Sequence, residues 1–153
     1  MTTSHRSEDV ADESNQKALE ELARAIEWNG GQFALILARC NSASLQKGLV
    51  QTLQELCSVE IRQRVLEQSF KLLYGNLQTE LGQNKPQALM IFGLESVSDL
   101  DQLLTAANQV REEFRKNFNF PLVLWVTDEV LQKLIRLAPD FYSWGTTVEL
   151  APR

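Results

Sequence analysis

Histidine and cysteine are scarce in this sequence, which limits the chemistry that it supports. The 153 residues include one histidine, His5, and two cysteines, Cys40 and Cys57. The two cysteines have neither the spacing of zinc ligands nor that of a redox pair. His5 lies in a polar N-terminal segment, so a cysteine–histidine or serine–histidine pair would need that segment to fold back. These scarcities argue against a zinc site and against nucleophilic catalysis.

Basic residues and long apolar runs are also few. Lysine and arginine total 15 against 20 acidic residues, which gives a net charge of −5 and leaves no excess of cations for nucleic-acid phosphates. No apolar run approaches the roughly 20 residues of a membrane-spanning helix. The N-terminus lacks the apolar centre of a signal peptide. We therefore expect a cytoplasmic protein with reduced thiols that binds neither nucleic acid nor membranes.

Apolar runs alternate with helical patterns along the chain. Three continuous apolar runs and two weaker patterns predict strands at residues 33–38, 59–66, 88–94, 121–126 and 146–150. Apolar residues at helical spacing predict helices around residues 19–26, 45–56, 70–81, 98–118 and 128–135. Ser98 and Asp101 have the spacing of a capping box for the fourth of these helices. This alternation predicts an α/β domain whose mostly parallel sheet carries helices on both faces.

The two ends of the chain differ from the rest in composition. Residues 1–15 are polar and charged with almost nothing to bury, which predicts a mobile tail. Residues 16–150 form the predicted domain, and residues 151–153 are interpreted as the start of a linker.

Parallel sheets bind ligands at the carboxyl ends of their strands. The residues directly after the predicted strands are therefore the candidates for a site. Arg39, Cys40, Asn41, Ser42 and Ser44 follow the first strand; Glu95 and Ser96 follow the third; Thr127 and Asp128 follow the fourth.

The segment LILARCNSASLQKGLVQTL (35–53) has the frame of a phosphate-binding loop without its residues. A working loop needs glycines, a lysine and a hydroxyl at fixed spacing. No glycine lies between Gln32 and Lys47, and Ser44 stands where the lysine belongs. Lys47 lies two or three residues too far along. Alternatively, Asn41, Ser42 and Ser44 cap the following helix.

The other candidates also have two interpretations each. Glu95 is either a ligand at the mouth of the crevice or a solvated loop acid. Thr127 is expected to cap the next helix, and Asp128, in the first turn of that helix, suits its dipole. Cys40, near a helix N-terminus that would lower its pKa, is either a reactive thiol or a structural residue.

Three aromatic residues, Phe141, Tyr142 and Trp144, are concentrated near the end of the chain. They form either part of the core or a docking surface, because aromatic side chains are enriched at interface anchors.

Several segments resemble a known group of domains: ALILARCNS, AANQVREEFRKNFNFPLVLWVTDEVLQKLIRLAPDFYSW and TTVEL. They are similar to a domain at the N-terminus of large bacterial regulatory proteins, often cyanobacterial or actinobacterial, that carry tetratricopeptide-type repeats. That domain resembles the STAND and AAA-type P-loop ATPases. The resemblance covers residues 18–150 and implies a three-layer sandwich with strand order 5-1-4-3-2.

The resemblance also locates what is missing. The place of the phosphate loop falls on residues 38–45, and the place of the metal-binding carboxylate holds Gly93. Neither place has the residues for nucleotide chemistry, which argues against hydrolysis and against a bound cofactor. Thr127 follows what would be the sensor strand.

We therefore expect a non-catalytic P-loop-like module that contacts a partner protein, a downstream domain of the same polypeptide or a second copy. The alternative is an atypical nucleotide- or anion-binding regulatory domain without efficient hydrolysis, in which Arg39 or Lys47 assists the N-terminus of the helix after Ser44. A third hypothesis is a Cys40-dependent enzyme or redox switch.

Overall fold

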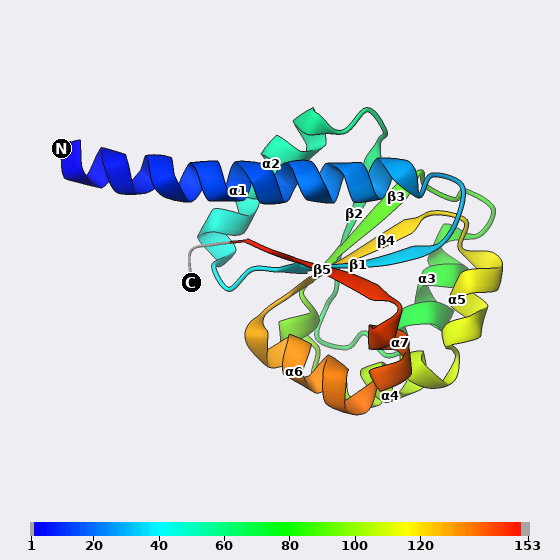
Figure 1. Cartoon of the computed structure of the whole chain (residues 1–153). Helices are drawn as coiled ribbons and strands as arrows, with labels where there is room; N and C mark the ends of the chain where they lie inside the picture. Colours follow the sequence, from blue (N-terminus) through cyan, green and yellow to red (C-terminus); the bar gives the residue numbers. More distant parts are fainter. Residues whose placement is uncertain (1, 151–153) are drawn as a thin grey trace.

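The structure, a computed structural model, describes the backbone of residues 2–150 and the side chains of residues 15–150. Helices and strands alternate along the chain (Figure 1). The strands are β1 (Ala34–Arg39), β2 (Ile61–Val65), β3 (Ala88–Phe92), β4 (Pro121–Val126) and β5 (Gly145–Glu149). The helices are α1 (Thr2–Trp28), α2 (Ala43–Leu56), α3 (Leu73–Leu81), the 3-10 turn η1 (Leu94–Ser96), α4 (Leu100–Gln109), α5 (Arg111–Asn117), α6 (Asp128–Leu137) and α7 (Pro139–Ser143).

The five strands form one sheet in the order β2-β3-β4-β1-β5, and every pair is parallel. The predicted α/β class is confirmed, and the sheet is fully rather than mostly parallel. Read from the other edge, this order is the 5-1-4-3-2 that the resemblance implies. Periodicity alone does not give a spatial order, because it describes each strand without its neighbours.

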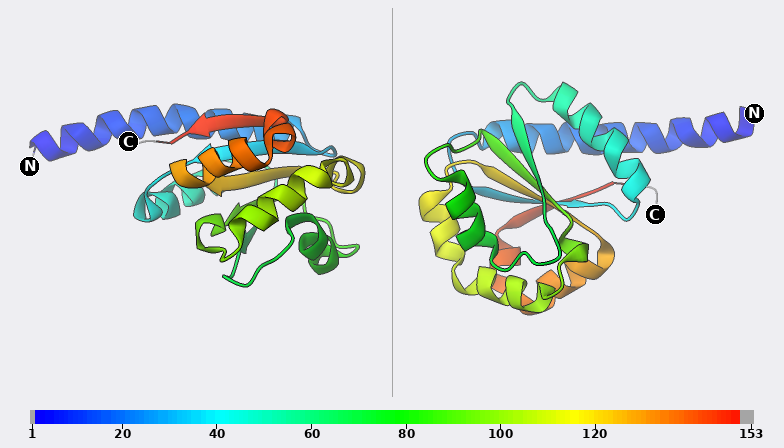
Figure 2. Two further views of the ribbon diagram at one scale, coloured as in Figure 1. Left: turned by 90° about the horizontal axis from the view of Figure 1, so that it is seen from below. Right: turned by 180° about the vertical axis from the view of Figure 1, so that it is seen from behind.

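Helices cover both faces of the sheet, which gives three layers. Helices α1 and α2 pack on one face and α3 to α7 on the other (Figures 1 and 2). In β1, Leu35 and Leu37 belong to the core beneath α3 to α7, whereas Ile36 and Ala38 belong to the core beneath α1 and α2. A strand covered on both faces must be apolar at every position, so the continuous runs mark the central strands.

The predicted helix over residues 98–118 is wrong in two respects. It is divided into α4 and α5 at Val110, and α4 begins at Leu100. The capping box is also wrong, because Ser98 is held in the preceding turn, where its N–H donates to the carbonyl of Gln68 at 3.0 Å. Asp101 instead accepts a hydrogen bond from Lys133 Nζ at 2.8 Å.

Helix α1 runs without a break from Thr2, so the backbone of residues 2–15 is helical rather than a separate coil. Its N-terminal half extends beyond the sheet (Figure 1). The mobility predicted for residues 1–15 stays a prediction. The predicted linker, residues 151–153, lies outside the described residues. No helix within residues 2–150 is both long and apolar enough to cross a bilayer.

Candidate functional site

The candidate site lies where β1 and β4 end side by side. The chain leaves β1 toward α2 on one face of the sheet and leaves β4 toward α6 on the opposite face. Adjacent parallel strands whose connections diverge in this way open a crevice at their carboxyl ends, where ligands of α/β proteins bind. The sequence-based candidates Arg39, Asn41, Thr127 and Asp128 all lie at this position.

Arg39, at the end of β1, reaches two carboxylates from other elements. Its guanidinium donates hydrogen bonds to Asp128 at the start of α6 and to Glu149 at the end of β5. The hydrogen bond from Arg39, with a second contribution from Asn41, lowers the pKa of Asp128 below its ordinary value. The hydrogen bond to Asp128 likewise raises the pKa of Arg39. One cation thus joins the ends of β1, β4 and β5.

The backbone closes the same crevice. Asn41 Oδ1 accepts a hydrogen bond from the N–H of Asp128 at 2.9 Å. The N–H of Cys40 donates to the carbonyl of Val126, also at 2.9 Å. These contacts connect the loop after β1 to the turn after β4. We call the group formed by Arg39, Asn41, Asp128 and Glu149 the crevice bridge.

Helix caps account for the other polar residues of the two turns. Ser42 Oγ accepts from the N–H of Leu45 at 3.2 Å and is the N-cap of α2. Thr127 Oγ1 accepts from the N–H of Val130 at 3.3 Å and is the N-cap of α6. The capping interpretation is confirmed for these two residues and wrong for Asn41, which belongs to the crevice bridge. Ser44 lies in the first turn of α2, with its hydroxyl 3.2 Å from that of Ser42.

Lys47 and Glu95 lie apart from the crevice bridge. Both line an open groove of about 610 Å³ between α2 and the ends of β2 and β3. Glu95 also borders a smaller pocket of about 260 Å³ that contains Asp101 and Lys133. The candidates that follow β1 therefore lie in two places. Arg39 and Asn41 belong to the crevice bridge, whereas Lys47, one turn along α2, lines the groove. Among the side chains that the structure describes, no group of three histidines, cysteines or acids is placed to hold a metal ion.

Cys40 has the surroundings of a structural thiol. Its side chain is buried, and Sγ lies 3.5 Å from the carbonyl oxygen of Ser42. Burial raises the pKa of this thiol, which is the opposite of the shift expected from a helix N-terminus. Burial, and to a lesser extent the charge of Glu27, raises the pKa of Cys57 to about 11.

Both thiols are therefore expected to alkylate slowly near neutral pH, because the thiolate is the reactive form. The rate of Cys57 should increase about tenfold per pH unit up to its pKa of about 11. Iodoacetamide labelling followed by mass spectrometry measures both rates, and labelling in urea gives the unfolded reference. Fast labelling of native Cys40 at neutral pH would revive the hypothesis of a reactive cysteine.

The three aromatic residues near the end of the chain are divided between core and surface. Phe141 is fully buried in the core beneath α3 to α7 and is not available as part of a docking surface. Tyr142 and Trp144 are partly buried and pack against that core. The guanidinium of Arg115 lies 4.2 Å from the centre of the Trp144 ring. A contact surface around these two residues stays a prediction.

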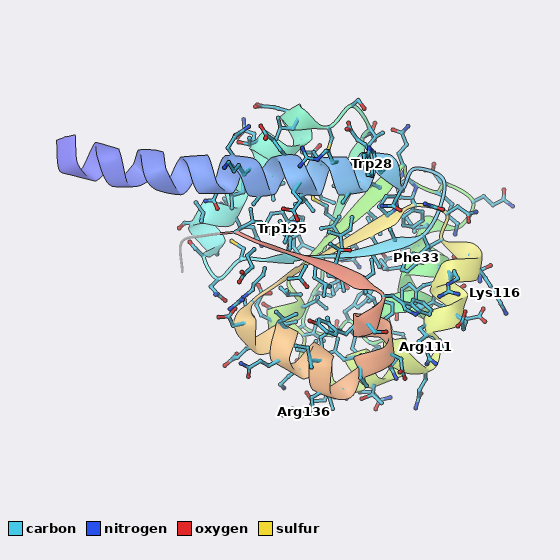
Figure 3. The ribbon with its side chains drawn as sticks, viewed as in Figure 1. Trp28, Phe33, Arg111, Lys116, Trp125 and Arg136 are labelled. Atoms are coloured by element: carbon cyan, nitrogen blue, oxygen red, sulfur yellow. The ribbon has the colours of Figure 1, made fainter. Side chains whose placement is uncertain are left out.

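The other two tryptophans differ from the partly buried Trp144 in the exposure of their side chains. Trp125 of β4 is buried inside the domain, whereas Trp28 at the end of α1 is 82% exposed (Figure 3). Trp28 was not singled out in the sequence, because it lies outside every motif.

Two residues of the site and its surroundings gave no signal in the sequence. Glu149 completes the crevice bridge although it is 110 residues from Arg39. Asn108, inside α4, accepts hydrogen bonds from the N–H groups of Asp140 and Phe141 at 3.0 and 2.9 Å, and so caps α7 from outside. Both contacts join distant parts of the chain, so no local pattern reports them.

The crevice bridge predicts a pH dependence of stability. Because the folded-state pKa of Asp128 is lowered, its contribution is present above the ordinary value of 3.8 and is lost as pH falls through the folded-state pKa. Asp128→Asn should therefore lower the urea midpoint at neutral pH, and the difference from wild type should vanish in acid. Glu129→Gln is the matched control, since Glu129 is also in the first turn of α6 but lines the pocket that contains Lys133. An equal effect of both substitutions would assign the difference to the helix dipole.

Comparison of the chain with protein-family models, with curated proteins and with solved structures found no match.

Proposed function

We propose that this chain is a non-catalytic domain of the P-loop-like type that works by protein–protein contact, as a regulatory module of a larger signalling protein. Its partner is another protein or a further domain of the same polypeptide. The observation that carries the proposal is the crevice bridge. At the place where α/β proteins bind ligands, side chains of the chain itself pair with one another.

Three of the groups that could recognise a phosphate here are engaged within the domain. The N–H of Asp128, at the start of α6, donates to Asn41. The N–H of Leu45, in the first turn of α2, donates to Ser42. Arg39, the cation closest to the crevice, is paired with two carboxylates. A nucleotide would have to displace these partners, and the resulting cost supports a module without nucleotide chemistry.

Thermal unfolding with and without millimolar Mg-ATP, Mg-GTP and ADP tests the first half of the proposal. We expect no shift of the melting temperature. A ligand at a hundred times its dissociation constant would add about 2.7 kcal/mol, which corresponds to several degrees for a chain of this size. A clear shift that disappears in Ser44→Glu would replace the proposal with the atypical nucleotide- or anion-binding domain.

Sedimentation velocity over a wide concentration range, without nucleotide, tests the second half. Self-association that weakens in Trp144→Ala would support a contact surface around the partly buried aromatic residues. The matched control is Trp28→Ala, which removes a more exposed tryptophan from a different element. Equal weakening by both substitutions would argue against that location.

A further inference from the structure

One asparagine of this chain is followed by a glycine. The sequence has eight asparagines, and of these only Asn29 precedes a residue without a side chain, Gly30. In such a pair the backbone nitrogen of the glycine can attack the side-chain amide of the asparagine, because no Cβ on the glycine blocks the approach. The rate of this reaction in a folded protein depends on how the fold holds the two groups.

The attacking nitrogen is only weakly engaged. Asn29, Gly30 and Gly31 form the turn after α1, and both glycines are exposed. The nitrogen of Gly30 lies 3.4 Å from the carbonyl oxygen of Glu27. This distance is beyond the roughly 2.7–3.2 Å of an ordinary N–H···O hydrogen bond. Solvent can therefore reach the proton that must leave this nitrogen.

Two side-chain hydrogen bonds hold the amide that is attacked. Asn29 Nδ2 donates to the carbonyl of Ala25, one turn back in α1, at 2.7 Å. Asn29 Oδ1 accepts from Gln32 Nε2 at 3.1 Å. Both partners lie within four residues of Asn29, so the amide is released by a local movement of the turn and not by unfolding of the domain. Because an ordinary hydrogen bond changes such an equilibrium roughly fivefold, the two bonds together should slow the reaction by about thirtyfold.

The turn has space for the product. A Cβ at Gly31 would meet no atom within 4 Å, and a Cβ at Gly30 would meet only the carbonyl oxygen of Glu27, at 3.6 Å. A reaction that changes the path of the main chain here therefore meets little steric resistance.

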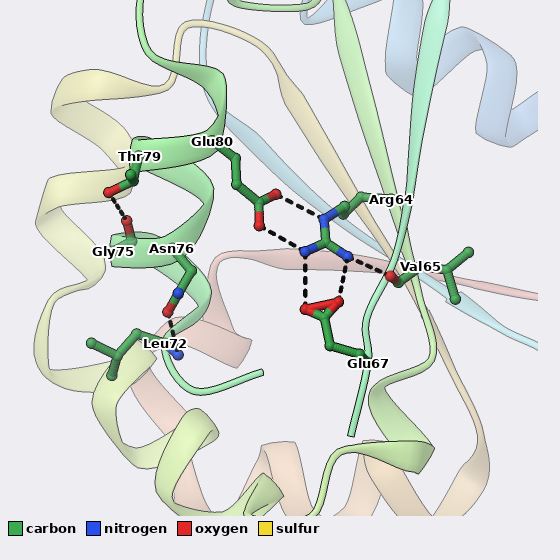
Figure 4. A network of polar contacts seen from close by, with 8 residues as sticks. All are labelled: Arg64, Val65, Glu67, Leu72, Gly75, Asn76, Thr79 and Glu80. Carbon is green, nitrogen blue, oxygen red and sulfur yellow. Dashed lines mark hydrogen bonds and ion pairs between the residues drawn. The ribbon is translucent and has the colours of Figure 1, made fainter. Parts of the chain in front are cut away.

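Asparagines elsewhere in the described chain are held more firmly. Asn76 Oδ1 accepts from the N–H of Leu72 at 2.9 Å (Figure 4), and the next residue, Leu77, is buried inside α3. Asn41 belongs to the crevice bridge, and the next residue is Ser42, the N-cap of α2. In both pairs the attacking nitrogen would carry the Cβ of its residue.

We propose that Asn29 is a site of spontaneous deamidation in the folded protein, with water as the only co-reactant. The nitrogen of Gly30 loses its proton to solvent and forms a bond to Cγ of Asn29. The bond from Cγ to Nδ2 breaks, and Nδ2 takes up a proton and leaves as ammonia, so that a cyclic imide remains. Water then opens the ring. Cleavage between the ring nitrogen and Cγ gives aspartate, whereas cleavage between the ring nitrogen and the main-chain carbon gives isoaspartate, which adds one carbon atom to the main chain.

The product changes the end of α1, a consequence that does not depend on the proposed function. A carboxylate at position 29 has no N–H for the carbonyl of Ala25, and it places a negative charge at the carbonyl end of the helix dipole. The last turn of α1, which carries the exposed Trp28, is therefore expected to loosen. Ile26 and the core residues before it stay packed, because they are buried against the sheet.

The test follows the purified chain during incubation at mildly alkaline pH, where the nitrogen of Gly30 loses its proton more readily. Trypsin releases residues 25–39, with Asn29 as their only asparagine, and residues 40–47, with Asn41. Mass spectrometry measures the conversion of each amide to an acid, and labelling by an isoaspartyl methyltransferase detects isoaspartate. We expect Asn29 to react within about a hundredfold of its rate in guanidinium chloride, and at least about ten times as fast as Asn41.

Two variants change the rate in opposite directions. Gly30→Ala adds a Cβ that fits, at a residue whose φ is not left-handed, and should slow the reaction at least about tenfold without a change in melting temperature. Gln32→Ala removes the hydrogen bond to Asn29 Oδ1 and should speed the reaction about threefold. Reaction only through global unfolding would lower the native rate by about a thousandfold or more. A native rate more than about a hundredfold below the rate in guanidinium chloride therefore overturns the proposal. It is also overturned by an equal rate in Gly30→Ala or by aspartate without isoaspartate.

Asn29→Asp tests the consequence for α1, because it introduces the same charge into every molecule. We expect the amides in the last turn of α1 to exchange with deuterium about tenfold faster than in wild type, while those around Leu22 are unchanged. Equal exchange of the last turn in both proteins would overturn the predicted loosening of the helix end.

Discussion

Phe114→Ala is expected to lower the free energy of unfolding by about 4 kcal/mol, the middle of the range for a large buried aromatic residue. Phe114 of α5 has no exposed surface. Its ring centre lies 4.9 to 5.8 Å from those of four other aromatic residues: Phe33, Tyr74, Phe118 and Phe141. Truncation removes all four ring contacts at once. The four rings cannot collapse fully into the space, because each is held by a different part of the fold: directly before β1, in α3, directly after α5 and in α7.

Urea and thermal unfolding measure this effect, which corresponds to a decrease of roughly 8–16 °C in melting temperature for a chain of this size. Phe114→Leu should cost about 1.5 kcal/mol, because it keeps most of the apolar volume. Trp28→Ala removes a larger ring that is 82% exposed and should change stability by less than about 0.5 kcal/mol. A loss below about 1 kcal/mol for Phe114→Ala would contradict close packing of the aromatic cluster.

The cluster also shows why the aromatic segment near the chain end had two interpretations. Phe141 is fixed in the core through Phe114 and through Asn108, which accepts a hydrogen bond from its N–H at 2.9 Å. Both partners lie about thirty residues earlier, on α4 and α5. The sequence shows how many aromatic residues a segment contains. Whether they are buried depends on which distant helices and strands pack against that segment in the folded chain.

The predictable part of the fold follows from burial on two faces. Runs such as residues 121–126 have no polar position, and this pattern is expected for the central strands of a parallel sheet. The edge strands are harder to predict for the same reason. In β2, Val65 is 64% exposed although it has the place of an inward residue in the alternating pattern. An edge strand has a neighbouring strand on one side only. The alternation of apolar and polar residues along it therefore does not predict which side chains are buried.

The site divides into local and distant contacts. Ser42 and Thr127 were predictable as caps, because each bonds to an N–H three residues later. Arg39 and Asn41 were placed at the crevice by the strand pattern, but their roles were not predictable. Their partners Glu149 and Asp128 are 110 and 87 residues away, and sheet order brings them together.

Gly93→Asp is expected to lower the free energy of unfolding by about 3 kcal/mol and to create no Mg²⁺ site. By the resemblance, position 93 is the place of a metal-binding carboxylate. In this structure Gly93 has φ = +88°, a conformation that side chains with a Cβ rarely adopt. A Cβ at this position would lie 3.0 Å from the carbonyl oxygen and 3.3 Å from the nitrogen of Leu66. Leu66 cannot move away freely, because its N–H holds the end of β2 to Phe92 of β3.

Two alanine variants separate the backbone strain from the steric contact. Gly31 has a nearly identical φ of +83°, and a Cβ there meets no atom within 4 Å, so Gly31→Ala should cost about 1 kcal/mol for the left-handed conformation alone. Gly93→Ala should cost about as much as Gly93→Asp, since both add the Cβ that meets Leu66. Unfolding in urea, with and without millimolar Mg²⁺, gives all three values. Stabilisation of Gly93→Asp by Mg²⁺ would mean that this strand end relaxes and that the new carboxylate binds the metal ion. The expected loss would instead mean that the close approach of Leu66 excludes any side chain at position 93, including the carboxylate that the resemblance would place there.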